Sequence, residues 1–160
     1  SDAPFSRQDP AADEVFYAKP RLVNHLDEYC SRQIGELYKR LLPYDGRILD
    51  LMSSWISHLP DEFSVAQITG LGMNQQELEQ NPMLASRHVH DLNQQPQLPF
   101  EDGVFDGIVC TASIEYLVSP QQVFRELART MKPGAPLMIT FSNRWFPPKA
   151  IKAWGIAHEF

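Results

Sequence analysis

Acidic, phenolic and imidazole side chains stand beside apolar segments of the sequence, where a buried element would hold them. Asp50 lies near the end of "RILDL", Asp91 follows "SRHVH", and Glu115 and Tyr116 follow "VFDGIVCTASI". Side chains of these types act as general acids and bases. Because Glu115 follows an apolar run, burial would raise the pKa of its carboxyl group; a helix-start charge or a solvated side chain is the alternative. His25, close to an aspartate, is a second candidate for proton transfer.

Other site chemistries find little support. The two cysteines, Cys30 and Cys110, are far apart, and no His, Cys or Asp spacing indicates a metal site. No order of Ser, His and Asp indicates hydrolysis. We expect the remaining histidines in the middle of the chain to be structural or exposed. Such cysteine usage fits a reducing compartment, so we expect a cytoplasmic protein.

The elements that would position these groups follow from hydrophobic spacing. Strands are predicted at residues 47–51, 63–71, 86–92, 104–114 and 135–142. Helices are predicted at residues 20–42, 74–81, 120–131 and 147–160. Asn74, with Glu77 three positions on, predicts a capping box, and Lys132-Pro133-Gly134 predicts a type II turn.

Strands that alternate with helices predict an α/β fold, with a mostly parallel sheet covered by helices on both faces. Ligands of such sheets lie beyond the carboxyl ends of the strands. Those ends carry Asp50, residues 72–74, Asp91 and residues 111–116, which we expect at one edge. Residues 1–14 are polar and Pro/Ala-rich, which predicts a flexible lead, and residues 15–160 predict a single domain.

The composition limits the partners. The formal net charge is −6, which argues against a general nucleic-acid surface, so no nucleic acid is expected. No apolar run approaches the ~20 residues that cross a bilayer, so no membrane partner is expected. No basic segment followed by an apolar stretch opens the chain, so no signal peptide is predicted.

The loop after the first strand contains no glycine. Ser53 and Ser54 could cap a short helix that begins at Trp55 and ends at Pro60. Free N–H groups at that helix start would suit an anionic group. Trp55 would anchor the loop in the core or close over a ligand.

Two stretches of the second half, "LPFEDGVFDGIV" and "IEYLVSPQQVFRELARTMKPGAPLMITF", resemble a known family. They are similar to class I S-adenosylmethionine-dependent methyltransferases of the type 11 kind. The resemblance covers residues 47–142 and implies a three-layer, Rossmann-like fold, with S-adenosylmethionine as cofactor. It implies a cofactor site formed by these residues: Asp50, Met52, Ser53, Ser54, Met73, Asn74, Asp91, Leu92 and Thr111.

Individual roles also follow from the resemblance, each with a structural alternative. Met73 would pack on the adenine, or in the core. Asp91 would face the adenine amino group, or make a loop hydrogen bond. Asn74 could bond a ribose hydroxyl, or only cap a helix. Glu115 and Tyr116 occupy positions that face the transferred methyl group, and the helix carrying His25 often covers the cofactor.

This sequence departs from the family pattern at two places. Met52, Ser54 and Ile56 replace the three glycines of the cofactor loop, and Gly72 replaces the carboxylate that binds the ribose hydroxyls. Two hypotheses follow: a methyltransferase acting on a small-molecule acceptor, or a catalytically inactive methyltransferase-like binding or scaffold protein. Nicotinamide chemistry is disfavoured because G-x-G-x-x-G is absent.

The end of the sequence leaves a structural question. The family sheet closes with an antiparallel pair of strands, for which the residues after Ser142 leave little room. Either that pair is missing from the sequence given, or the fold is minimal and a partner covers the sheet edge. The aromatic and basic residues of "SNRWFPPKAIKAW" would line an acceptor pocket or contact a protein, which includes a homodimer.

Overall fold

The computed structural model describes residues 3–157, apart from the side chains of residues 64 and 65. Within these residues five parallel strands form one sheet in the order β3-β2-β1-β4-β5. The strands are β1 Arg47–Leu51, β2 Gln67–Gly72, β3 Ser86–Val89, β4 Gly107–Thr111 and β5 Leu137–Thr140. The predicted α/β class is confirmed. Because every pair is parallel, all carboxyl ends lie at one edge, as expected for Asp50, Asp91 and Thr111.

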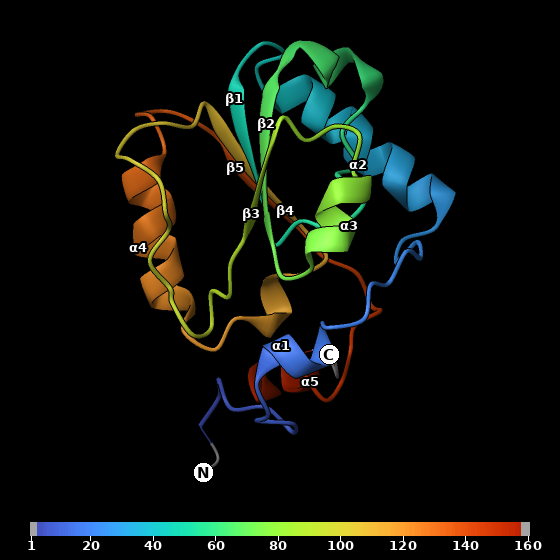
Figure 1. Cartoon of the computed structure of the whole chain (residues 1–160), viewed down its shortest axis with the longest axis vertical. Helices are drawn as coiled ribbons and strands as arrows, with labels where there is room; N and C mark the ends of the chain where they lie inside the picture. Colours follow the sequence, from blue (N-terminus) through green and yellow to red (C-terminus); the bar gives the residue numbers. More distant parts are fainter. Residues whose placement is uncertain (1–2, 158–160) are drawn as a thin grey trace.

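Helices cover both faces of the sheet, and alternate strand residues supply the two cores. Helices α2 (Glu28–Leu41) and α3 (Gln75–Gln80) lie on one side, and α4 (Pro120–Thr130) lies on the other (Figure 1). Ile48 and Val109 point into the first core, whereas Leu49 and Ile108 point into the second. The period-2 alternation of strand side chains explains this division.

Most predicted elements formed, but β2, β3, β4 and β5 are all shorter than predicted, and three elements begin clearly later. The end of the predicted fourth strand forms a 3-10 helix instead (η2, Ile114–Tyr116). Helix α2 begins at Glu28 rather than at residue 20, because Asp27 caps it by accepting a hydrogen bond from the Cys30 N–H. His25 therefore lies at a bend in the irregular segment before the helix, not on the helix as predicted. Residues 61–65 form a 3-10 helix (η1, Asp61–Val65), so β2 starts later than predicted. Helix α5 (Lys152–Ala157) also begins later, and residues 158–160 lie outside the described residues.

The turn before β5 and the cap of α3 were predicted correctly. Gly134 has φ +80°, and the Ala135 N–H donates to the Lys132 carbonyl at 3.0 Å, as a type II turn requires. The Asn74 side chain accepts from the Glu77 N–H at 3.1 Å. The second half of the predicted capping box is absent, because the Glu77 carboxylate binds other groups instead.

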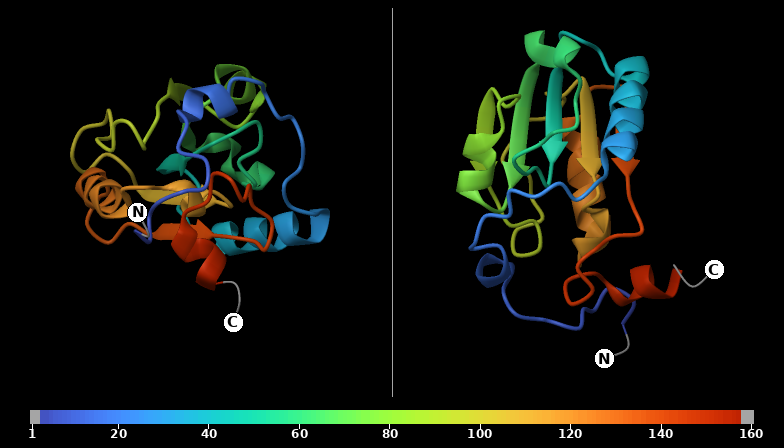
Figure 2. Two further views of the ribbon diagram at one scale, coloured as in Figure 1. Left: turned by 90° about the horizontal axis from the view of Figure 1, so that it is seen from below. Right: turned by 90° about the vertical axis from the view of Figure 1, so that its right-hand side faces the viewer.

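Segments from the two ends of the chain meet beneath the carboxyl edge of the sheet (Figure 2). Arg7 forms a β-bridge with Ile151, and its Nη1 donates to both carboxylate oxygens of Asp13, at 2.8 and 2.9 Å. Lys149 is fully buried, and its ammonium lies 3.1 Å from Asp9 and 3.3 Å from Asp13. These contacts hold α1 (Asp13–Phe16) and the segment before α5 against the site.

Two further expectations concern surfaces. β5 is an edge strand of the sheet described here, so cover by a partner or a second copy stays a prediction. None of the helices within residues 3–157 combines the length and apolar character needed to cross a bilayer.

Candidate active site

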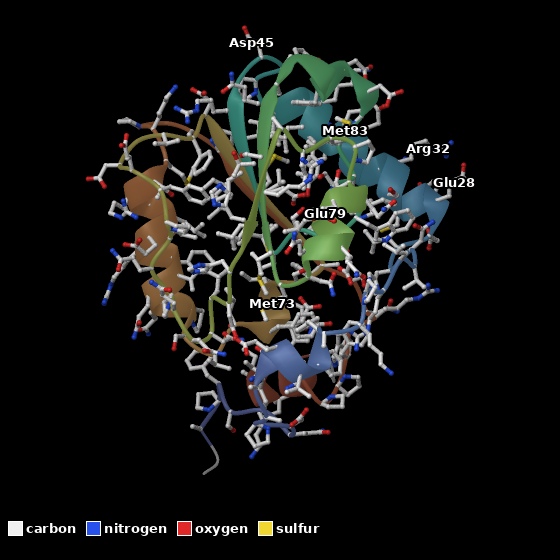
Figure 3. The ribbon with its side chains drawn as sticks, viewed as in Figure 1. Glu28, Arg32, Asp45, Met73, Glu79 and Met83 are labelled. Carbon is white, nitrogen blue, oxygen red and sulfur yellow. The ribbon has the colours of Figure 1, made fainter. Side chains whose placement is uncertain are left out.

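A cavity of about 310 Å³ opens at the carboxyl edge of the sheet. Its walls come from the loops after β1, β2, β3 and β4 and from both end segments of the chain. Of the predicted cofactor residues, those lining it are Met52, Ser53, Ser54, Met73, Asn74, Asp91 and Leu92. The structure thus brings together predicted cofactor residues from three separate stretches of the sequence. Figure 3 labels Met73, just past the end of β2, whereas Asp45 lies at the opposite end of the sheet.

The other predicted residues lie around this cavity. His25 and Tyr116 line it, while Asp50 and Thr111 line a smaller neighbouring cavity of about 60 Å³. Glu115 lines neither of these cavities and is fully buried. The predicted site is therefore divided into residues that could touch a ligand and residues that support them.

The loop after β1 is held by hydrogen bonds rather than by glycines. Met52 has φ +56°, the left-handed region that glycine favours. The Ser53 N–H donates to the Leu71 carbonyl at 2.8 Å, which fixes the loop on the end of β2. The hydroxyls of Ser53 and Ser57 donate to the buried carboxyl group of Asp50 at 2.6 and 2.7 Å. Burial raises the Asp50 pKa to about 7 despite these bonds.

The predicted helix at Trp55 is wrong, because residues 53–60 are irregular. The serine hydroxyls that would have capped it donate instead to carboxylates, Ser53 to Asp50 and Ser54 to Glu77. The loop therefore offers no helix start for an anion. The Trp55 indole donates to the Val23 carbonyl at 3.2 Å and ties the loop to the segment before α2.

Glu77 connects this loop to the N-terminal segment. Its Oε2 accepts from the Ser54 hydroxyl at 2.8 Å, and its Oε1 accepts from the Arg21 N–H at 2.7 Å. Asn81 adds a second tie, donating to the Ser54 carbonyl at 2.9 Å. Glu77 lines the large cavity, a position that the sequence analysis assigned only to helix capping.

Asp91 presents one satisfied and one unsatisfied oxygen. Its Oδ1 accepts from the N–H groups of Asn93 and Gln94 at 2.8 and 3.2 Å, which is the loop role considered above. Its Oδ2 is buried and has no hydrogen-bond partner among the described residues. A buried acceptor left in this state costs free energy that a ligand donor can recover.

Arg21, like Glu77, is a site residue that sequence reasoning missed. Its guanidinium lies 4.3 Å from the ring centre of Phe16 and 5.4 Å from that of Phe146, and Nη2 donates to the Phe16 carbonyl. Nη1 is buried without a partner in the described part of the chain, and Arg21 lines the cavity. No local pattern marks it, because only the fold brings residue 21 to the sheet edge.

The opposite wall of the cavity is aromatic. The Tyr116 hydroxyl accepts from the Phe146 N–H at 2.9 Å, and burial raises its pKa. Burial also raises the pKa of Glu115 to about 7, and neither of its carboxyl oxygens has a hydrogen-bond partner within residues 3–157. The His25 ring packs edge-on against Phe146 at 5.6 Å, and burial lowers the pKa of its imidazole. A neutral imidazole can accept a proton.

Across residues 3–157, no group of three or more His, Cys, Asp or Glu side chains is placed to hold a metal ion.

This fold and cavity define a Rossmann-like domain with a ligand site at the carboxyl edge of a parallel sheet. The family model described as "Methyltransferase domain" matches residues 52–139, more than half of the sequence. The chain therefore belongs to the class I S-adenosylmethionine-dependent methyltransferase family, as the sequence resemblance suggested, and S-adenosylmethionine is the cofactor that this membership indicates.

Curated relatives are similar over most of this chain. It is 27% identical to Methyltransferase GfsG of Streptomyces halstedii over 78% of this chain and 48% of that protein. It is 25% identical to the biotin biosynthesis bifunctional protein BioHC of Teredinibacter turnerae, over 82% of this chain and 21% of that protein. The chain thus spans half or less of the length of these relatives.

Solved structures support the fold. An S-adenosylmethionine-dependent methyltransferase from Aquifex aeolicus superposes with a TM-score of 0.54 at 16% identity, over 83% of this chain and 85% of that one. The [4+2]-cyclase SpnF superposes with a TM-score of 0.58 at 20% identity, over 80% of this chain and 55% of that one. At such identities the likeness concerns the fold alone.

Proposed function

We propose that this chain binds S-adenosylmethionine in the 310 Å³ cavity and transfers its methyl group to a small-molecule acceptor. One observation carries the proposal: Asp91 Oδ2 and Arg21 Nη1, both buried in residues that line the cavity, find no partner among the described residues. A carboxylate and a guanidinium with unused hydrogen-bonding atoms are complementary to a ligand that has an amino group at one end and a carboxylate at the other. S-adenosylmethionine is such a ligand.

The remaining walls fit the rest of the cofactor. Met73 and Leu92 supply apolar surface beside Asp91, which suits an adenine ring. The hydroxyls of Ser53 and Ser54 already donate to Asp50 and Glu77. Arg21 is therefore the better partner for the methionine carboxylate. Arg21 thus takes the place of the loop N–H groups that the sequence analysis considered for an anionic group.

The acceptor would lie against the aromatic wall. When bound, the cofactor supplies a methyl group on a sulfonium, a good leaving group, so alignment of the acceptor contributes most of the rate. Tyr116 and Phe146 provide a rigid surface for that alignment. His25, neutral because burial lowers its pKa, can take a proton from an acceptor hydroxyl or amine. Glu115, fully buried beside Tyr116 in sequence, would act as a positioning residue.

A binding protein without catalysis is the second candidate. The observation that favours it is the loop after β1, whose carbonyl at Ser53 fills the space above Gly72 where the family carries its ribose carboxylate. The open cavity argues against a fully blocked site, because Met52 lines its wall and Trp55 lines only the smaller cavity.

Calorimetry with two ligands tests the proposal. We expect the protein to bind S-adenosylhomocysteine and, more weakly, 5′-methylthioadenosine, which lacks the amino-acid part. Arg21→Met should weaken S-adenosylhomocysteine about ten- to a hundredfold, the value of a lost charge-assisted hydrogen bond, and leave 5′-methylthioadenosine nearly unchanged. Absence of binding by the wild-type protein at millimolar ligand would rule out the proposal. Release of S-adenosylhomocysteine with an acceptor would separate the enzyme from the binding protein.

A further inference from the structure

The position at which the family carries its ribose carboxylate cannot hold a side chain in this protein unless the neighbouring loop moves. A Cβ on Gly72 would lie 2.1 Å from the Ser53 carbonyl oxygen and 3.2 Å from Leu78 Cδ2. The Ser53 carbonyl cannot move away easily, because its own residue bonds to Leu71 through the N–H and to Asp50 through the hydroxyl. A ribose-binding group must therefore come from elsewhere.

Asn74, the nearest polar alternative, is already occupied. Its Oδ1 accepts from the Glu77 N–H, and its Nδ2 donates to the carbonyls of Tyr17 and Ala18 at 2.8 and 3.3 Å. These bonds use both ends of the amide. Asn74 caps α3 and tethers the N-terminal segment, which leaves it poorly placed to bind a ribose diol.

Glu77 meets the requirements that Asn74 does not. It lies in the first turn of α3, and its side chain lines the large cavity together with Gly72 and Ser54. Each carboxylate oxygen accepts one hydrogen bond, Oε1 from the Arg21 N–H and Oε2 from the Ser54 hydroxyl. A carboxylate oxygen has about two acceptor positions, so each retains one for a ligand hydroxyl.

We propose that Glu77 binds the vicinal hydroxyls of the cofactor ribose, so that the carboxylate expected at the end of β2 acts from the first turn of α3. This inference rests on the proposed function. The two fixed donors orient the carboxylate before the ligand arrives, which reduces the ordering cost of binding. The Glu77 carboxylate also accepts from the backbone N–H of Arg21. Glu77 would therefore bind the ribose and, at the same time, position Arg21 for the methionine carboxylate.

A double-mutant cycle between protein and ligand tests the contact directly. The two ligands are S-adenosylhomocysteine and its 2′,3′-dideoxy analogue, and calorimetry measures the affinity of wild type and Glu77→Gln for both. We expect the wild type to bind the dideoxy analogue about ten- to a hundredfold more weakly than the parent. Glu77→Gln should bind S-adenosylhomocysteine more weakly than the wild type does, by the same factor. Its affinity for the dideoxy analogue should be close to that of the wild type.

Two control variants separate contact from support. Ser54→Ala removes the hydroxyl bond to Glu77 but keeps the carboxylate, so it should still prefer the ligand with hydroxyls. Glu79→Gln changes an exposed residue on the same helix, labelled in Figure 3, and should behave as wild type. Thermal melts of each variant establish that it is folded.

The outcomes are distinguishable. If Glu77→Gln lowers the affinity for both ligands equally, Glu77 acts only through Ser54 and Arg21. That result would overturn the inference and leave the proposed function intact. A wild type that binds both ligands equally would overturn the inference without any variant, so the test does not depend on whether Glu77→Gln folds. A wild type that binds neither ligand would overturn both proposals.

Discussion

The carbonyl oxygen of Ser53 stands directly over Gly72, so close that a Cβ at residue 72 would approach it to 2.1 Å. At a non-bonded distance under 3.0 Å, one of the two atoms would have to shift. The contact joins the loop after β1 to the end of β2, and the Ser53 N–H bond to Leu71 closes the same junction. The altered cofactor loop and the missing ribose carboxylate are thus one structural change.

Restoring the family residue at this junction should therefore harm the protein. We expect Gly72→Asp and Gly72→Ala each to lower the free energy of unfolding by about 1–3 kcal/mol or more, because either forces the loop off β2. Neither should tighten S-adenosylhomocysteine binding. Urea unfolding and calorimetry measure the two effects. Gly155→Ala is the matched control, since a Cβ there meets nothing within 4 Å. Tighter binding by a stable Gly72→Asp protein would contradict this account.

Met52 offers the opposite test, because its backbone already has the conformation of a glycine. Its φ of +56° costs a residue with a side chain about 1–2 kcal/mol, so Met52→Gly recovers backbone strain while losing partly buried side-chain contacts. We expect a net change in stability of no more than about 1 kcal/mol, with cofactor affinity equal or tighter. Met52→Ala removes the same contacts but keeps the strain, so it should be less stable than Met52→Gly. Chemical unfolding of both variants checks the order, and a more stable alanine would refute it.

Asp91 should determine which base the cavity accepts. Asp91→Asn keeps an oxygen for the loop N–H groups but presents an amide donor where Oδ2 stands, so it should weaken S-adenosylhomocysteine about ten- to a hundredfold. The hypoxanthine analogue of the ligand carries an acceptor in place of the amino group. We expect Asp91→Asn to prefer that analogue and the wild type to reject it, as measured by calorimetry. An unchanged preference would place the adenine elsewhere.

The buried carboxyl group of Asp50 should make stability depend on pH. Its folded pKa, about 7, lies above its ordinary value of 3.8, so between these values the folded state holds a proton that the unfolded state has released. This stabilisation is complete below about pH 3.8 and is lost as pH rises through about 7. Asp50→Asn should therefore gain stability relative to wild type as pH rises, by at most about 1.4 kcal/mol for each pH unit.

Comparison at each pH isolates this group from others. Burial lowers the pKa of His58 to about 4, which gives the opposite trend in both proteins and cancels in the difference. Urea unfolding at about pH 5.5, 6.5 and 7.5, a range that brackets the expected pKa of Asp50, measures this difference. Asp45→Asn, at an exposed position, is the control for the chemical change from aspartate to asparagine. A pH-independent difference for Asp50→Asn would mean that the buried carboxyl group is ionised throughout.

The sequence by itself determined the sheet and its direction. The predicted β1 at residues 47–51 and the helix after Pro120 agree closely with the structure, and so does the turn at Gly134. These features depend on local apolar spacing, on proline and glycine geometry and on short caps, all readable within a few residues. The carboxyl edge of the sheet, and with it Asp91, could be located for the same reason.

Only the tertiary structure decided which side chains line the cavity and which hydrogen bonds they make. Ser54 could cap a helix by its type, but it donates to Glu77 because α3 packs beside the loop. Arg21 enters the site from a segment that local patterns assigned to a helix, and Gly72 is required by a carbonyl from another loop. Hydrogen-bond partners and close contacts between distant segments depend on three-dimensional packing, and no spacing along the chain encodes them.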